Sequence, residues 1–162
     1  MRGIPRRLEP MDAREYFEAA RAAQRHIDGR LAAIRAMRER QAVRAQGYEV
    51  VGRSPAASDP MAATDELVDA ERAARSELEG YEREVTSARE VCRGIRRANP
   101  AHPVWGDVLE LHYLELLGWA DAGRYLGMTS EGARRAAYAA LDWVDAVGLA
   151  RARDGLGQAA LF

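Results

Sequence analysis

The sequence predicts an all-α protein. Ala, Arg, Glu and Leu dominate its 162 residues, and all four favour helices. Apolar residues recur at alternating spacings of three and four along two long stretches, as on helices that pack against a neighbour. Pro and Gly gather at a few places rather than being spread evenly. We therefore predict a long antiparallel, coiled-coil-like helical hairpin over residues 12–98 and a group of three helices over residues 103–148.

The first long helix is expected over residues 12–46, after a flexible N-terminus of residues 1–11. Asp12 and Glu15, which follow Pro10, form a start that resembles a capping box. The apolar seam of this helix is good in the middle and polar at its far end. Its members are Phe17, Ala20, Gln24, Ile27, Leu31, Ile34, Arg38 and Gln41.

A loop is expected over residues 47–60, which hold two Gly, two Pro and a run of small polar residues. The second long helix begins either at Asp59 and Pro60, as N-cap and first helical residue, or at Thr64. Asn99 and Pro100 end it. Its seam again alternates threes and fours and comprises Leu67, Glu71, Ala74, Leu78, Tyr81, Val85, Ala88, Cys92 and Ile95.

The two long helices also predict self-association. Neither helix can bury its seam alone, and Phe17, Val68 and Val91 have no assigned partner within the hairpin. A bare two-helix hairpin of this length exposes more apolar surface than a soluble monomer normally tolerates. We therefore expect a homodimer.

A third helix is expected to begin at Pro103 and to be apolar over a wide arc, up to Gly118. The next residues, 119–144, read as a helix, a short turn and a second helix. Gly123 is small where the two helices would cross, and Gly127 tolerates the positive φ of the turn. Thr129 is a good N-cap for the second helix.

The second helix of this pair has an apolar side for packing and a polar side. The apolar side comprises Ala133, Ala137, Ala140, Leu141 and Val144. The polar side, with the capping residue, could face the major groove of DNA, where Arg reads guanine edges or binds phosphate and hydroxyls bind the backbone. These candidate DNA contacts are Thr129, Ser130, Glu131, Arg134, Arg135 and Tyr138. The same pattern also occurs in helical hairpins that bind nothing.

A compact basic cluster ends the second long helix. Arg93, Arg96 and Arg97 either stabilise the negative end of the helix dipole or bind phosphate beside the helix pair, and Arg124 is a further candidate for a phosphate contact. The overall charge argues against strong autonomous DNA binding. The chain carries a net charge of −1, and residues 103–162 hold five Arg against eight Asp and Glu. A weak binder that needs a second copy or a partner fits this charge better.

Several classes of site are not expected. The single Cys92 allows no intramolecular disulfide and no zinc spacing, and His26, His102 and His112 are far apart in the chain. His112 alone on an apolar helix is more often a satisfied core or surface residue than a ligand. No catalytic motif is visible, so we expect neither an enzyme nor a cofactor. Without a signal peptide or a membrane span, we expect the protein in the cytoplasm, with residues 149–162 as a frayed tail in which Leu161 and Phe162 could anchor onto a neighbour.

The segment LHYLELLGWADAGRYLGMTSEGARRAAYAALDWV resembles the fourth conserved region of bacterial sigma factors. His112, Tyr113 and Leu114 match its lead, Trp119 starts the first helix, and Leu126 with Gly127 forms the turn. With the hairpin in front, nearly the whole chain is similar to small phage- and prophage-encoded regulators of late transcription of the RinA/ArpU type. The resemblance implies a regulator that binds double-stranded DNA in a bacterial host cell, with RNA polymerase as a possible partner. The alternative is a phage assembly or DNA-packaging protein, such as a scaffold or small-terminase-like subunit, which uses the helix pair for docking.

Overall fold

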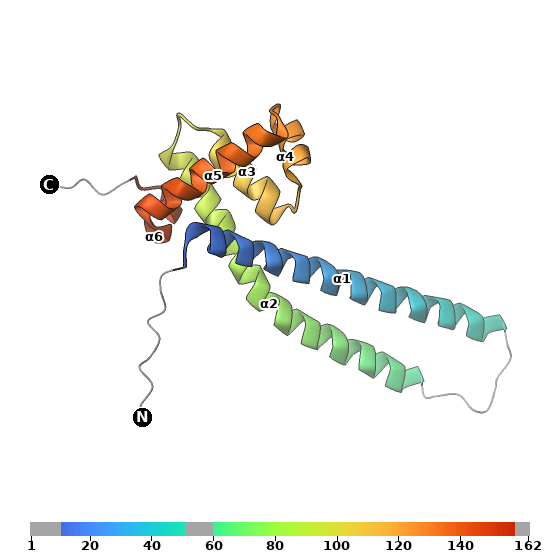
Figure 1. Cartoon of the computed structure of the whole chain (residues 1–162). Coiled ribbons are helices and arrows are strands. Elements are labelled where there is room, and N and C mark those ends of the chain that lie inside the picture. The colour runs from blue at the N-terminus through green and yellow to red at the C-terminus, as the bar shows by residue number, and fades with distance from the viewer. Residues whose placement is uncertain (1–10, 51–59, 158–162) are drawn as a thin grey trace, which may run out of the picture. The chain divides into compact units, whose positions relative to one another are not determined.

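The computed structural model describes residues 11–50 and 60–157, and over these ranges the prediction of an all-α protein is confirmed (Figure 1). The helices are α1 (Ala13–Val50), α2 (Pro60–Ala98), α3 (Val104–Leu109), the π-helix η1 (Glu110–Leu114), α4 (Trp119–Leu126), α5 (Ser130–Val147) and α6 (Leu149–Arg153). They form two compact units. The boundaries between the units fall within α1 and within α2, not after the end of α2. One unit is Arg25–Arg83, and the other holds the described residues before and after it.

The long helices begin where the sequence indicates, and α2 also ends at Ala98 as predicted, whereas α1 extends further. A carboxylate oxygen of Asp12 accepts a hydrogen bond from the amide of Glu15 at 2.7 Å, which confirms the predicted N-cap. Helix α1 continues to Val50, so the expectation of a loop from residue 47 is wrong for residues 47–50. A single glycine such as Gly47 costs a helix about 1 kcal/mol relative to Ala, which weakens it without ending it. Helix α2 begins at Pro60, the first of the two expected starts. The rest of the expected loop, residues 51–59, lies outside the described residues, as do residues 1–10 and 158–162.

The predicted seams are largely buried or half-buried, and the exceptions are Leu31 and Arg38. Ile27, Leu78 and Val85 are buried, and Ile34 and Tyr81 are half-buried. Leu31 is 47% exposed, so its assignment to the closed part of the seam is wrong. Its position follows the heptad spacing, but it lies at the edge of the contact between α1 and α2, where it lines a groove.

The main core lies in the unit that joins the start of α1, the end of α2 and helices α3–α6. Phe17 is fully buried, and its ring centroid lies 5.6 Å from that of Tyr113. Val91 is also buried in this core. Two of the three residues that have no assigned partner in the predicted hairpin are therefore covered by the chain itself, whereas Val68 remains exposed.

The C-terminal region differs from the expected frayed tail. Helix α6 occupies Leu149–Arg153, and Ala152 is completely buried. Gly148, with φ of 87°, makes the change of direction between α5 and α6. The expectation of a frayed segment is therefore wrong for residues 149–153, because a short helix after this glycine packs onto the core.

Candidate nucleic-acid interface

The turn between α4 and α5 has the geometry that the two glycines predict. Gly127 has φ of 70°, and the amide of Met128 donates to the carbonyl of Gly123 at 2.8 Å. A Cβ atom on Gly123 would lie 2.8 Å from the carbonyl oxygens of both Met128 and Thr129. Only glycine allows this close approach of the two backbones, so both predicted roles are confirmed.

Thr129 caps α5 as predicted. Its side-chain oxygen accepts a hydrogen bond from the amide of Gly132 at 3.0 Å. The bond satisfies one of the free amides in the first turn of α5. Thr129 thereby fixes the point at which α5 leaves the turn.

The two sides of α5 are confirmed as the sequence predicts them. The five small or aliphatic residues of the apolar side, Ala133, Ala137, Ala140, Leu141 and Val144, are all buried. On the opposite side, Ser130, Glu131, Arg134 and Arg135 are exposed. Burial of one side fixes the rotation of α5 about its axis, and this holds the four polar side chains on the surface.

The Arg side chains around this surface form only weak, solvent-exposed ion pairs with their acidic neighbours. Arg135 lies 3.6 Å from Glu131, and Arg124 lies 3.3 Å from Asp121 on α4. All four side chains are more than half exposed, and such pairs contribute only about 0.2–1 kcal/mol. Both Arg side chains can therefore leave these pairs to bind a phosphate.

Tyr138 differs from the exposed contact residue that the sequence predicts. Its ring is half-buried and meets the edge of Trp119 at a centroid distance of 6.2 Å. The guanidinium groups of Arg14 and Arg134 lie 5.4 and 5.6 Å from the ring centroid. Tyr138 therefore connects α5 to α4 and to the start of α1 and orients Arg134 through a cation–π contact.

The basic cluster at the end of α2 does not act as one group. Arg96 is half-buried and pairs with Glu110 and with Asp107, the latter at 2.6 Å. Burial opposes the charge of Glu110, but the hydrogen bond and charge of Arg96, with a further contribution from Arg89, hold the pKa of this carboxyl below its ordinary value. Two carboxylates thus already compensate the charge of Arg96, which argues against the phosphate contact predicted for this residue. Arg93 and Arg97 are exposed, and Arg97 donates weakly to the carbonyl of Asp154 at 3.5 Å.

Two features of the site are not predicted from the sequence: the exposure of Tyr125 and the partners of His112. Tyr125, next to the turn on α4, is strongly exposed beside Arg124. His112 is buried, and its ring stacks on Trp119 at a centroid distance of 3.5 Å. Arg21 donates to its Nε2 at 2.6 Å, so the neutral ring carries its proton on Nδ1 and donates to the carbonyl of Leu117 at 2.7 Å. The spacing of apolar residues along α4 could have predicted that Tyr125 points outward. The partners of His112 could not be predicted in this way, because Arg21 is distant in the sequence.

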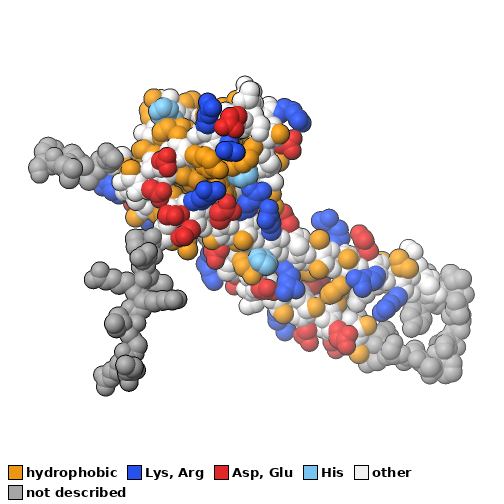
Figure 2. Space-filling model, in the orientation of Figure 1, with side chains coloured by type: hydrophobic (Ala, Val, Ile, Leu, Met, Phe, Trp, Pro, Cys, Tyr) orange, Lys and Arg blue, Asp and Glu red, His pale blue; other side chains and the backbone are white. Residues whose placement is uncertain are grey.

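The face of helices α3–α6 seen in Figure 2 has no continuous basic surface, because acidic and basic side chains alternate there with hydrophobic ones between them. Around the start of α5, Arg124, Arg134 and Arg135 stand against two acidic residues, Asp121 and Glu131. The described residues contain no group of three His, Cys, Asp or Glu placed to hold a metal ion. None of the helices in the described ranges is long and apolar enough to cross a membrane.

Comparison of the chain with protein-family models, curated proteins and solved structures found no match.

Proposed function

We propose that this chain is a DNA-binding transcription regulator of the phage or prophage type. In this proposal α4 and α5, with the helical segment before them, form a sigma-region-4-like helix-turn-helix, and α5 enters the major groove. One observation carries the proposal: the glycine turn and the Thr129 cap rigidly position an α5 whose outer side bears exposed Ser130, Glu131, Arg134 and Arg135.

Each of these side chains has a role in the proposal. Arg134 and Arg135 bind guanine edges or phosphates, for which the planar guanidinium is well suited. Ser130 binds a backbone phosphate near the first turn of α5, where the helix dipole favours an anion. Glu131 accepts from a cytosine amino group or repels other sequences. Arg124 supplies a phosphate contact from α4.

The charge supports weak binding by a single copy. Three Arg side chains surround the start of α5, and counterion release from only a few phosphates gives modest affinity and a small salt dependence. The proposed regulator therefore acts as a homodimer or together with RNA polymerase, and the long helices α1 and α2 provide the contact. It works in the bacterial cytoplasm and needs neither cofactor nor catalysis.

The experiment begins with selection of a binding sequence from a random DNA library by the purified protein. Binding of that sequence is then measured by fluorescence anisotropy for the double variant Arg134→Ala/Arg135→Ala. We expect a loss of about 1–3 kcal/mol for each base contact, which is about tenfold or more in affinity. The matched control, Arg40→Ala/Arg44→Ala, removes the same charge from α1 and should bind like the parent. Equal affinity of both double variants would contradict the assignment of α5.

A second candidate is a phage assembly or DNA-packaging subunit. The acidic surplus of residues 103–162 and the exposed apolar side chains of the long helices favour it. Light scattering separates the two proposals, because a closed ring of many subunits supports packaging, whereas a dimer supports regulation.

A further inference from the structure

The outer half of the long helices, Arg25–Arg83, buries little of its own apolar surface. Among its described side chains, Ile27, Ala74 and Leu78 are buried. Leu31 on α1 and Val68 on α2 are 47% and 44% exposed. Two helices of this length that share so small a core are marginal in water without a further packing partner.

A groove runs along one side of this unit and has a volume of about 400 Å³. It is lined by Leu31, Ile34, Arg35 and Arg38 of α1 and by Glu71, Arg75, Leu78 and Glu82 of α2. Val68 precedes Glu71 by three residues and Arg75 by seven, so it lies on the same side of α2. The exposed Leu31 and Val68 therefore belong to one surface, and we call it the Leu31 groove.

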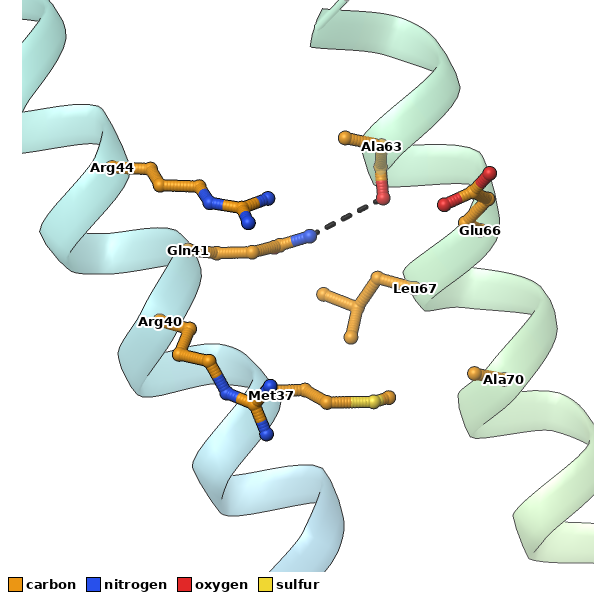
Figure 3. Close-up of a pocket in the computed structure, with 8 residues that line it drawn as sticks. All are labelled: Met37, Arg40, Gln41, Arg44, Ala63, Glu66, Leu67 and Ala70. Atoms are coloured by element: carbon orange, nitrogen blue, oxygen red, sulfur yellow. Dashed lines mark hydrogen bonds between the residues drawn. The ribbon is translucent and has the colours of Figure 1, made fainter.

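A second groove of this unit is less suited to a partner. Figure 3 shows that Gln41 extends from α1 to α2, where its amide donates to the carbonyl of Ala63 at 3.2 Å. Arg40 and Arg44 reach into the same space from α1, and Glu66 flanks it on α2. Gln41 thus bridges this groove. The Leu31 groove is likewise crossed by one pair of the chain's own side chains, Arg38 and Glu71, but two half-exposed aliphatic residues border it.

The two helices of this unit carry opposite charge. Residues 25–47 of α1 hold six Arg against Asp28 and Glu39, and residues 61–83 of α2 hold seven acidic residues against three Arg. Within the chain, two ion pairs join the oppositely charged helices: Arg30 lies 2.9 Å from Glu77, and Arg38 lies 2.6 Å from Glu71. A neighbouring helix placed against α1 is therefore favoured if it is acidic, and one placed against α2 if it is basic.

We propose that the Leu31 groove is closed by the same groove of a second copy of this chain, in a four-helix bundle where each α1 lies between two α2 helices. This inference rests on the proposed function only in that it assigns a surface and a symmetry to the expected homodimer. A second copy supplies the required chemistry on both sides, because it presents an acidic α2 to α1 and a basic α1 to α2.

The charges also select the symmetry of the bundle. A two-fold axis parallel to the helices places like helices on the diagonal and unlike helices side by side. A two-fold axis perpendicular to the helices places α1 beside α1 and α2 beside α2, which brings charges of the same sign together. The parallel axis is therefore the favoured arrangement.

The ion pairs between α1 and α2 of one chain show which residues of the two helices lie at the same height along the bundle. Arg30 is level with Glu77, and Arg38 is level with Glu71. A parallel two-fold axis keeps these levels, so Leu31 meets the partner's Leu78. Arg35 comes level with the stretch between the partner's Glu71 and Arg75, on a helix that is acidic overall. The first contact closes apolar surface, and the second places a cation against a helix of opposite net charge.

The first test measures mass by sedimentation equilibrium in the full chain at tens of micromolar, without DNA. We expect twice the 17.9 kDa of one copy. Leu31→Asp should raise the Kd of the dimer by about tenfold or more, because it places a charge in a desolvated contact. Val43→Asp is the matched control, since Val43 is 69% exposed on the same helix and lines neither groove. A monomeric parent, or equal Kd values for both variants, would overturn the proposal.

The second test distinguishes the two symmetries by reversing a charge on α1, and it leaves the apolar contact of Leu31 unchanged. Arg35→Glu should weaken the dimer several-fold if α1 lies beside the partner's α2. The same substitution should strengthen the dimer if α1 lies beside the partner's α1, and that result would overturn the proposed bundle. Arg40→Glu changes the charge of α1 equally on the side of the second groove and should alter the Kd less.

The outcomes are independent of DNA binding. A dimer with the expected response to Leu31→Asp and Arg35→Glu supports the bundle even if Arg134 and Arg135 prove unimportant for DNA. Conversely, a monomer that still binds a selected DNA sequence through these two Arg residues contradicts the bundle and leaves the regulator proposal in place.

Discussion

Replacing Glu110 by Gln should destabilise the unit that contains α3–α6. The carboxylate of Glu110 is 20% exposed and accepts hydrogen bonds from Arg89 and Arg96, which both belong to α2. Glutamine has a similar size but no charge, and it offers one carbonyl oxygen in place of two carboxylate oxygens. The variant therefore leaves two half-buried Arg side chains with weaker partners.

The expected cost follows from this geometry. A hydrogen bond to a charged group contributes about 1.5–3 kcal/mol when buried, whereas an exposed ion pair contributes about 0.2–1 kcal/mol. Both Arg side chains are about one third exposed, so values between these limits apply. We expect a loss of about 2 kcal/mol in the free energy of unfolding, or about 4–8 °C in Tm at 2–4 °C per kcal/mol.

The effect of this substitution should depend on pH. The pKa of Glu110 is lowered in the folded protein, so the carboxylate contributes stability above the ordinary pKa of Glu, about 4.3. This contribution is lost as the pH falls through the lowered pKa. The difference between parent and variant should therefore be constant near neutral pH and should shrink below about pH 4.

Tryptophan fluorescence during urea unfolding reports on this unit, because all three Trp residues of the chain, Trp105, Trp119 and Trp143, lie in it. Glu115→Gln is the matched control. Glu115 is 52% exposed and lies 3.4 Å from Arg89, so its loss should cost less than about 0.5 kcal/mol. Equal stability of the two variants at neutral pH would refute the structural role assigned to Glu110.

Three further predictions concern the packing of single residues. Gly123→Val should cost more than about 2 kcal/mol in the same unfolding assay, because its Cβ would meet two carbonyl oxygens at 2.8 Å; unchanged stability would contradict the close helix crossing. The thiol of Cys92 is buried, and burial raises its pKa to about 12, so a disulfide reagent such as Ellman's reagent should modify it only at the rate of unfolding. Leu78→Asp should cost several kcal/mol and reduce helical circular dichroism, whereas unchanged thermal unfolding would show that Leu78 is not part of the seam.

The parts of the fold that the sequence predicts well depend on local chemistry. Asp12 and Thr129 cap helices because their side-chain oxygens reach amides three residues ahead. Gly127 adopts a positive φ that few other residues tolerate. The buried side of α5 follows from spacing within one helix, and the same spacing gives the exposed position of Arg134 and Arg135. These features need only residues that are neighbours in the chain.

The expectations that differ from the structure depend on distant residues. The heptad spacing includes Leu31, but in the structure Leu31 lies at the edge of the contact between α1 and α2 and lines a groove. Arg96 belongs to a basic cluster in the sequence, yet Asp107 and Glu110 compensate its charge after the chain turns back. Tyr138 has the spacing of an outward residue and is covered because Trp119 and Arg14 come to lie beside it. In each case the missing information is which side chain lies opposite.

The segment before α4 shows that some residues of the predicted motif belong to the scaffold rather than to the proposed DNA-binding surface. His112, Tyr113 and Leu114 are three consecutive buried residues, and they lie in a π-helix in which the amide of Glu115 donates to the carbonyl of Glu110 at 2.9 Å. The wider turn lets neighbouring side chains pack in different directions. His112 then stacks on Trp119 and so fixes the start of α4. His112, Tyr113 and Leu114, the lead of the predicted motif, thus orient the helix pair from inside, whereas Arg134 and Arg135 of α5 lie on the surface.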